Sequence, residues 1–433
     1  PTPSPGPSPA TTVQLSAATY TVNEGCVETL ITVTRTGPNS LPSVVDYVVN
    51  NATATQRGDF TYAAGFVVFS AGETSKTFPV LISEDGYAEG TESATVQLSN
   101  PVGATLGSPN AASLQIQDND NLAVEINPID SAATFVGQHY HDFLNRQADA
   151  QGQAFWTNRI TSCGNDAACI DRERTQTSTA FFLSIEFQNT GYFAFRFYRA
   201  SFVDTAQRPR GVPRYLEFLR DEQTLQRNVV VGQTNWEFNL EQNKQGFALD
   251  WVDRAEFLAE YPTSMTREEF IDKLFLRSAA TPTTQERNQA LSAYDSGSSL
   301  KEKRAKGIRA VIDTGAVYNA QYNPAFILMQ YFGYLRRNPN NAPDSDYAGY
   351  DYWLTKMNNF SVPGEDVRDA NVALSRVNRA EIVKAFIVST EYRGRFGTDS
   401  SRGQQFGSVA LARPSANWSH DMLATLVWFV RLV

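Results

Sequence analysis

Seven acidic side chains stand where predicted β-strands end in the first 120 residues of the chain: Glu24, Asp59, Glu84, Asp85, Glu89, Asp118 and Asp120. A β-sandwich can bring strand ends that are far apart in the sequence together at one tip. Carboxylates gathered in this way repel one another unless a hard cation binds them, and oxygen ligands of this kind suit Ca²⁺. These acids therefore predict a Ca²⁺ site and, with it, an extracellular setting.

Residue patterns that support catalysis are few. The sequence contains no Gly-x-Ser-x-Gly, P-loop or His-Glu-x-x-His motif. The acid pairs Glu268–Glu269 and Asp344/Asp346 would suit a glycosidase in principle. Solvated helix and loop positions explain these pairs more simply. We therefore expect a protein without catalytic residues, with an unrecognised hydrolase as a remote alternative.

The cysteines and the net charge narrow the class of protein further. Cys163 and Cys169 bracket a short polar loop and would form a local disulfide in a secreted protein, or remain thiols in a cytosolic one. Cys26 is then either a buried thiol or a link to another chain. Three Cys and three His disfavour a Cys/His metal cluster, and a net charge of −9 argues against nucleic-acid binding.

The elements that must position the acids are predicted strands. Seven segments alternate apolar and polar residues and are separated by Gly, Asn, Pro or Asp: VQLSAATYTV (13–22), TLITVTRTG (29–37), SVVDYVV (43–49), FVVFSAG (66–72), KTFPVLIS (76–83), ESATVQLSN (92–100) and SLQIQD (113–118). This spacing, without a helical pattern between the segments, predicts an antiparallel, immunoglobulin-like Greek-key sandwich over residues 12–121.

The same region resembles the Calx-beta domain in the order and spacing of its motifs. They are VNEG (22–25), GD (58–59), FSAGETSK (69–76), ED (84–85) with Glu89, LSNP (98–101) and DND (118–120). The resemblance implies that the same seven acids ligate several Ca²⁺ ions at one tip. Gly86-Tyr87 replaces a further Asp of strong binders, and Asn119 interrupts the last acidic run. We therefore expect one ion, or binding in the millimolar range.

After residue 134 the apolar period changes to that of helices, and the sequence repeats itself. Residues 135–146 match 326–337, and residues 149–156 match 346–353. Each copy closes on a similar segment, AFFLSIEF (180–187) or AFIVSTEY (385–392). The conserved positions predict helix packing and two ion pairs, Arg146–Glu186 and Arg337–Glu391.

This repeat resembles a bacterial domain of unknown function, number 4214, that occurs in secreted and surface-layer-associated proteins. The resemblance implies a bacterial, secreted or surface-associated setting and no particular chemistry. The expected organisation is a Pro/Ser/Thr-rich arm (1–11), the Calx-beta sandwich (12–121), a linker (122–134), a helical repeat unit (135–190), a degenerate helical middle region (191–310) and a second unit with an apolar tail (311–433).

These expectations lead to two functional hypotheses. The first is a non-enzymatic, extracellular or cell-surface structural protein, such as a filament, surface-layer or adhesive component. It would associate with itself or with surface proteins and glycans, and not with nucleic acid. We expect no membrane-spanning segment in this chain. The alternative is a Ca²⁺-dependent glycan- or protein-binding module, in which Tyr347, Tyr350 and Tyr352 stack on sugars.

Overall fold

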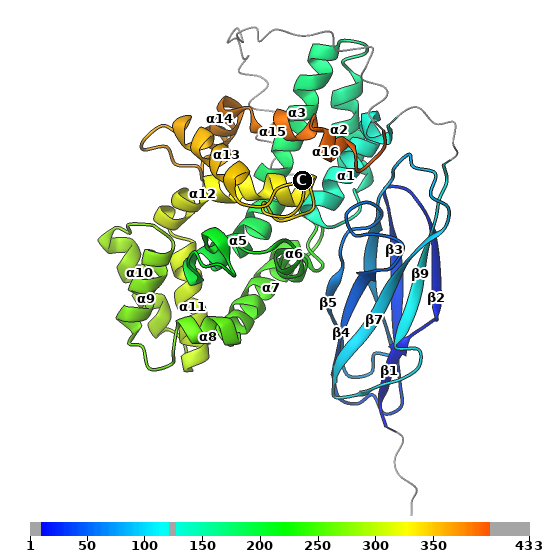
Figure 1. Ribbon diagram of the computed structural model, residues 1–433. Coiled ribbons are helices and arrows are strands. Elements are labelled where there is room, and N and C mark those ends of the chain that lie inside the picture. The colour runs from blue at the N-terminus through cyan, green and yellow to red at the C-terminus, as the bar shows by residue number, and fades with distance from the viewer. Residues whose placement is uncertain (1–9, 121–126, 399–433) are drawn as a thin grey trace, which may run out of the picture. The chain divides into compact units, whose positions relative to one another are not determined.

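The computed structural model describes residues 10–120 and 127–398, which divide into two compact units (Figure 1). Within these ranges the first unit comprises the residues up to His141, Asn145–Asp149 and 393–398, and the second comprises Asp142–Leu144 and Ala150–Tyr392. The predicted order of a β-sandwich followed by a mostly helical region is confirmed. Most of the Pro-rich arm (residues 1–9) and the apolar tail lie outside the described residues.

The sandwich is built from two sheets. The order in the five-stranded sheet is β2-β9-β7-β4-β5, and the order in the four-stranded sheet is β6-β3-β1-β8. The strands are β1 (Thr12–Leu15), β2 (Thr19–Asn23), β3 (Val27–Thr36), β4 (Ser43–Asn51), β5 (Ala64–Phe69), β6 (Ser75–Ile82), β7 (Glu92–Val102), β8 (Thr105–Leu106) and β9 (Ala111–Gln117).

The first predicted strand, 13–22, is wrong in one respect. It forms two strands in different sheets, because β1 pairs with β3 and β8 whereas β2 pairs with β9. The pairs β1–β8 and β2–β9 are parallel, so the expectation of a wholly antiparallel sandwich is also wrong. The second of these pairs positions the site, since Asn23 lies opposite Gln117 and the residues that follow both strands leave the sheet together.

The core of the sandwich lies between the two sheets. Alternate residues of the strands point inward, as the period of two predicts, and Leu15, Ile31, Val33, Val96 and Leu114 are fully or almost fully buried. Ile82, the last residue of β6, is also completely buried. The acidic pair Glu84–Asp85 follows it after one residue, so the chain carries carboxylates directly from the core to the tip.

The helical region begins at Pro128, within the segment 122–134 that we expected to be a linker. Its elements are η1 (Pro128–Asp130), α1 (Ala132–Leu144), α2 (Ala150–Thr161), α3 (Ala167–Leu183), α4 (Ile185–Asn189), α5 (Gly191–Ser201), η2 (Pro209–Gly211), α6 (Tyr215–Gln226), α7 (Trp236–Trp251), α8 (Ala255–Glu260), α9 (Arg267–Arg277), α10 (Thr284–Asp295), α11 (Leu300–Ile312), α12 (Gly315–Met329), η3 (Gln330–Tyr334), α13 (Ala348–Asn359), α14 (Ala370–Ala380), α15 (Ile382–Ile387) and α16 (Thr390–Arg393).

The matched segments 135–146 and 326–337 end in the same local turn. Asn145 and Arg336 occupy equivalent positions and have φ values of 47° and 49°. The next amide donates to a tyrosine carbonyl in each copy, from Arg146 to Tyr140 and from Arg337 to Tyr331, both at 3.4 Å. Each arginine also lies over the ring of that tyrosine, at 4.8 and 5.5 Å from the centroid.

The closing segments of the two copies share a serine cap. Ser184 Oγ donates to the Phe181 carbonyl at 2.8 Å and accepts the Phe187 amide at 3.1 Å. Ser389 Oγ makes the same two bonds, to Phe386 at 2.8 Å and from Tyr392 at 3.1 Å. Each serine therefore satisfies a free amide at the start of a short helix, α4 or α16.

Of the two predicted ion pairs, Arg337–Glu391 is confirmed. The guanidinium donates to both carboxylate oxygens of Glu391, at 2.6 and 2.9 Å. It also donates to the carbonyl of Asn341 at 2.9 Å and to Asp344 at 2.7 Å. The pair Arg146–Glu186 stays a prediction, because its two residues belong to different units.

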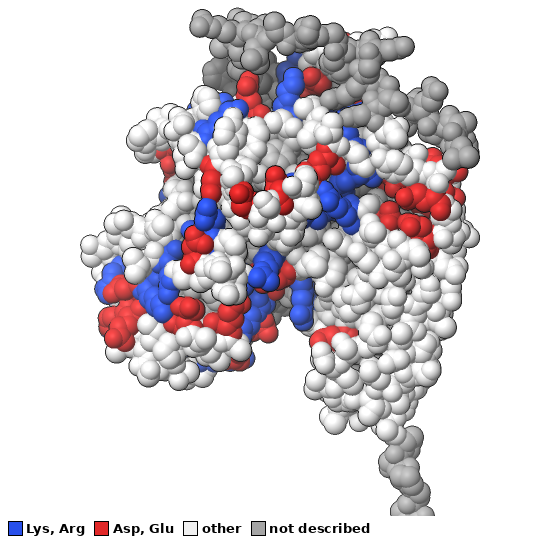
Figure 2. Space-filling model, in the orientation of Figure 1, with Lys and Arg blue, Asp and Glu red and all other residues white. Residues whose placement is uncertain are grey.

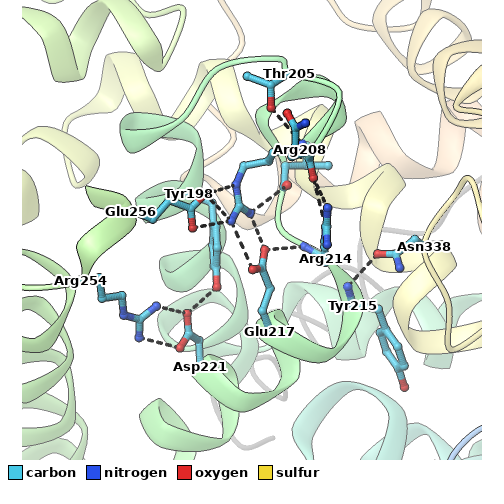
Figure 3. Close-up of polar contacts among 12 residues, drawn as sticks. Tyr198, Thr205, Arg208, Arg214, Tyr215, Glu217, Asp221, Arg254, Glu256 and Asn338 are labelled. Atoms are coloured by element: carbon cyan, nitrogen blue, oxygen red, sulfur yellow. Dashed lines mark hydrogen bonds and ion pairs between the residues drawn. The ribbon is translucent and has the colours of Figure 1, made fainter. Parts of the chain in front are cut away.

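A second arginine network fixes the segment between α5 and α8 (Figure 3). Arg208 is buried and donates to the carboxylates of Glu217 and Glu256. Arg254 binds Asp221 through both carboxylate oxygens, at 2.7 and 2.8 Å, and the same carboxylate accepts the Tyr198 hydroxyl. Because an arginine neutralises each of these carboxylates, the network positions helices rather than supplying a free acid or base.

Replacing either capping serine by alanine tests the equivalence of the two copies. Ser184→Ala and Ser389→Ala should each lower the free energy of unfolding of the helical region by about 1 kcal/mol, because each leaves one helix amide without its cap. Chemical denaturation followed by circular dichroism measures the change. Ser292→Ala, on the exposed side of α10, is the matched control and should change the stability little. A loss at only one of the two capping positions would contradict the equivalence.

Candidate metal centre

The seven predicted acids come together at one tip of the sandwich. Figure 2 shows a concentration of acidic side chains on the sandwich. Two groups of three are close enough to share an ion. One is formed by Glu24, Asp85 and Asp120 and the other by Asp59, Asp85 and Glu89. Within each group, one carboxylate oxygen from each acid lies within 4.8 Å of the corresponding oxygens of the other two. Asp85 belongs to both groups, so it lies between two candidate ion positions.

The parallel pair β2–β9 positions two sides of the tip. The Glu24 amide donates to the Gln117 carbonyl at 2.9 Å, which holds the residues after both strands together. Asp118 then organises the loop across the tip: its Oδ2 accepts the amides of Glu89 and Gly90 at 2.7 and 2.6 Å. Its Oδ1 accepts the amide of Asp120 at 2.7 Å. Asp118 therefore connects the end of β9 to the loop that carries Glu89.

Asp85 and Asp59 stand on neighbouring loops. Asp85 is only 3% exposed, and its amide donates to Glu24 Oε1 at 2.9 Å. Asp59 Oδ2 accepts the Thr55 amide at 2.6 Å, which closes the turn after β4. An antiparallel bridge between Phe60 and Ile82 then brings this turn beside the end of β6. The acids are therefore positioned by hydrogen bonds to backbone amides, several of which belong to other acids of the cluster.

The electrostatic consequence is a strong rise in several pKa values. Burial, followed by repulsion from Asp85, raises the pKa of Glu24 to about 8. Burial and the charges of Glu89, Asp59 and Asp120 raise the pKa of Asp85 to about 7. Burial raises the pKa values of Glu84 and Asp120 as well, with the charge of Asp120 acting on Glu84 and that of Asp118 on Asp120.

The pKa of Asp118 is shifted in the opposite direction. Burial would raise its pKa, but the amides of Gly90, Asp120 and Glu89 that donate to it outweigh this effect and lower the pKa. Asp118 is thus ionised at neutral pH by its own hydrogen bonds, whereas its neighbours need a proton or a cation to relieve their repulsion.

The donor set fits Ca²⁺ rather than a softer metal, since every member is a carboxylate. One oxygen points to an ion in particular. Asp120 Oδ2 is buried and has no hydrogen-bond partner among the described residues. A buried carboxylate oxygen without a partner is costly, and a bound cation would satisfy it. The residues present therefore fit the ion that the sequence predicts.

Sequence reasoning missed an eighth acid, Glu92. It lines a small recess at the tip together with Glu24, Asp59, Glu89 and Asp118. Burial, the charge of Asp59 and a hydrogen bond with that carboxyl raise the pKa of Glu92 to about 7. Glu92 is the first residue of β7, so its position at a strand start was the available signal.

Acids from the two pairs considered for a glycosidase make structural contacts. Glu269 accepts the Thr266 amide in a capping box, and Asp344 pairs with Arg337. The sugar-stacking hypothesis for the tyrosines of 347–352 fails at two positions, because Tyr347 and Tyr350 are 6% and 1% exposed. The two rings pack edge to face, with their centroids 5.7 Å apart. Of the three tyrosines, only Tyr352 is exposed.

The cysteines are placed in agreement with the disulfide hypothesis. Cys163 and Cys169 are joined in a disulfide bond across the turn between α2 and α3. Cys26, two residues after Glu24, is half-buried, lies outside the disulfide, and has its sulfur 3.8 Å from the carbonyl oxygen of Thr134.

Comparison with known proteins agrees with this geometry. Residues 8–120 match the family model of the Calx-beta domain. The β-sandwich is a Calx-beta domain. Similar curated proteins are sodium/calcium exchanger 1 of Rattus norvegicus, 30% identical over 135 residues, and the sodium/calcium exchanger Calx of Drosophila melanogaster, 31% identical over 106 residues. These alignments cover 27% and 24% of this chain and only 14% and 11% of the exchangers.

The chain is also similar to solved structures of Calx domains. The apo-form Calx CBD1 domain is 29% identical, covers 26% of this chain and all of its own, and has a TM-score of 0.25. The calcium binding domain CBD12 of CALX1.1 is 30% identical, covers 25% of this chain and 46% of its own, and has a TM-score of 0.25.

These comparisons correct the first functional hypothesis. The curated relatives of the Calx-beta domain are named for sodium/calcium exchange and not for a structural polymer. The expectation of a filament, surface-layer or adhesive component is therefore wrong, since ion binding accounts for acids that converge on one tip. Among the described residues, no helix has both the length and the apolar character that crossing a membrane requires.

The raised pKa values predict how the stability of the ion-free sandwich depends on pH. Glu24 and Asp85 hold their protons more tightly in the folded than in the unfolded chain, with folded pKa values of about 8 and 7. Their contribution is therefore complete below their ordinary pKa values and is lost as pH rises through 7 to 8. With chelator present, the melting temperature of the sandwich should fall by about 5 °C or more between pH 5.5 and 8.5.

Calcium should remove this dependence, because it compensates the ionised carboxylates. The gain in melting temperature on adding Ca²⁺ should thus be larger at pH 8.5 than at pH 5.5, as measured by differential scanning calorimetry. Glu24→Gln should flatten the pH profile without Ca²⁺, whereas Asp46→Asn, which removes a carboxylate of β4 outside the cluster, should leave it as it is. An ion-free protein that became more stable towards pH 8.5 would contradict the electrostatic account.

Proposed function

We propose that this chain is a Ca²⁺-binding regulatory module that takes up Ca²⁺ at the tip of its β-sandwich. The observation that carries the proposal is the sharing of Asp85 between two groups of acids, Glu24/Asp85/Asp120 and Asp59/Asp85/Glu89. The Calx-beta match and the names of the exchangers support Ca²⁺ as the ligand. Because this chain spans so little of the exchangers, their transport activity is not part of the proposal.

The geometry supports two ions rather than the single ion expected from the sequence. Asp85 would bridge the two, and the other four acids of the two groups would each face one of them. Eight carboxylates, counting Glu92, carry enough negative charge to balance two divalent cations. Since several of these groups have pKa values near 7 or 8, Ca²⁺ would displace protons when it binds at neutral pH.

The helical region has a different proposed role. Its two copies, whose matching segments begin at residues 135 and 326, share a turn and a serine cap, which supports the resemblance to the bacterial domain of unknown function 4214. The carboxylates of its Arg208 network are paired with arginines, which supports a non-enzymatic, packing role. The disulfide Cys163–Cys169 supports residence in an oxidising compartment, as in a secreted or surface protein.

Calorimetric titration of the full chain with Ca²⁺ tests the two-ion arrangement. We expect two ions per chain for the unmodified protein. Glu24→Gln and Glu89→Gln should each abolish or weaken at least tenfold the binding of one ion, because each acid belongs to one group only. Asp85→Asn should impair the binding of both ions.

Asp46→Asn is the matched control for these titrations and should bind two ions as the unmodified chain does. Circular dichroism of each variant in chelator shows whether the sandwich still folds. Absence of binding in the folded, unmodified chain would refute the function. Equal losses in Glu24→Gln, Glu89→Gln and Asp85→Asn would refute the separate positions.

A further inference from the structure

Two segments outside the sandwich but within the first unit surround the acidic tip. One is 127–138, which contains η1 and the start of α1, and the other is 393–397, which follows the last helix. We call these two segments the collar. They are far apart in the sequence, yet they are bonded to each other and to the loops that carry the acids.

The collar is held together by one asparagine and one ion pair. Asn127 Nδ2 donates to the carbonyls of Arg393 and Gly397, at 3.0 and 3.2 Å. Arg393 donates through both terminal nitrogens to the two carboxylate oxygens of Asp130, at 2.7 and 2.9 Å. The Arg393 side chain is only 2% exposed, so this bidentate pair is shielded from water on the arginine side.

The loop of Asp85 makes the most direct contact with the collar. The Gly86 amide donates to the Phe396 carbonyl at 2.9 Å. The Tyr87 hydroxyl donates to the Gly394 carbonyl at 3.1 Å. Asp85 itself accepts the Tyr87 amide at 2.8 Å. The bridging acid and the two collar contacts are therefore consecutive along three residues.

The other two acid-bearing loops are bonded to the collar in the same manner. Arg395 Nε donates to the carbonyl of Arg57, two residues before Asp59. The Cys26 thiol, two residues after Glu24, lies 3.8 Å from the Thr134 carbonyl. All three loops thus reach the collar within two residues of an acid that belongs to a candidate ion position.

Gly86 lies directly against the collar. A Cβ atom on Gly86 would lie 3.2 Å from Pro128 Cδ and 3.6 Å from the Phe396 carbonyl oxygen. The first of these distances is tight, so a side chain here would require Pro128 to shift by a few tenths of an ångström. Glycine therefore lets the loop of Asp85 approach the collar closely.

We propose that Ca²⁺ binding at the tip fastens the collar, so that residues 393–397 are held when the ions are bound and released when they leave. The inference rests on the proposed function and adds what the ion controls. Without Ca²⁺, the carboxylates of Asp85, Asp59 and Glu89, which lie within 4.8 Å of one another, repel each other and loosen the loops that carry them. Ca²⁺ draws them together and restores the positions of Arg57, Gly86 and Tyr87. Because coupling is reciprocal, the collar contacts must in turn strengthen Ca²⁺ binding.

Hydrogen exchange of the full chain, read by mass spectrometry with Ca²⁺ or chelator, tests the direction from ion to collar. Exchange in peptides covering 127–138 and 393–397 should slow on Ca²⁺ addition, by up to about 100-fold at 100 times the dissociation constant. Slower exchange in 84–90 with unchanged exchange in both collar peptides would overturn the inference and leave the proposed function standing. No change anywhere, with no binding heat, would overturn both.

The reverse direction is tested by Tyr87→Phe, which removes the hydroxyl bonded to Gly394 and no acid. Its affinity for Ca²⁺ should fall by about 2- to 10-fold, as expected for the loss of one hydrogen bond. Tyr20→Phe is the matched control, because it removes a hydroxyl that donates to the Thr32 carbonyl within the sandwich. Equal affinities in Tyr87→Phe and Tyr20→Phe, with both proteins folded, would contradict the coupling.

Discussion

Repulsion between carboxylates at the tip of the sandwich is the constraint on which the rest of the first unit depends. Hydrogen bonds to backbone amides hold Glu24, Asp85 and Asp118 close together when the loops are in place, so their charges repel one another at short range. The buried core of the sandwich ends at Ile82, directly before the loop that carries Asp85. Protons or a divalent cation must therefore compensate the negative charge of the carboxylates. At neutral pH, protons and the cation compete for these groups.

The sequence predicted much of this arrangement because strand ends are marked by simple local signals. The alternation of apolar residues and the turn residues between them located the strands and placed seven acids at their ends. Glu92 was missed because it begins a strand instead of following one. The splitting of residues 13–22 could not be predicted either, since β1 and β2 differ only in which partners they find across the fold.

Long-range contacts were beyond the reach of sequence patterns for the same reason. Gly86 reads as a missing ligand in the sequence, and only the structure shows that a side chain there would crowd Pro128. In the helical region, internal repetition identified positions such as Ser184 and Ser389 correctly as closing motifs. Their role as helix caps depends on the backbone geometry, which cannot be read from the sequence.

The parallel pairing of β2 with β9 has a mechanical consequence. β2 lies near the start of the sandwich and β9 at its end, and five residue pairs align along them. Tension applied between the two ends of the sandwich would act along these strands. Hydrogen bonds loaded in shear share the force and must break together, unlike those of a ladder opened from one end. The strands that deliver Glu24 and Asp118 to the tip therefore also form a clamp against pulling.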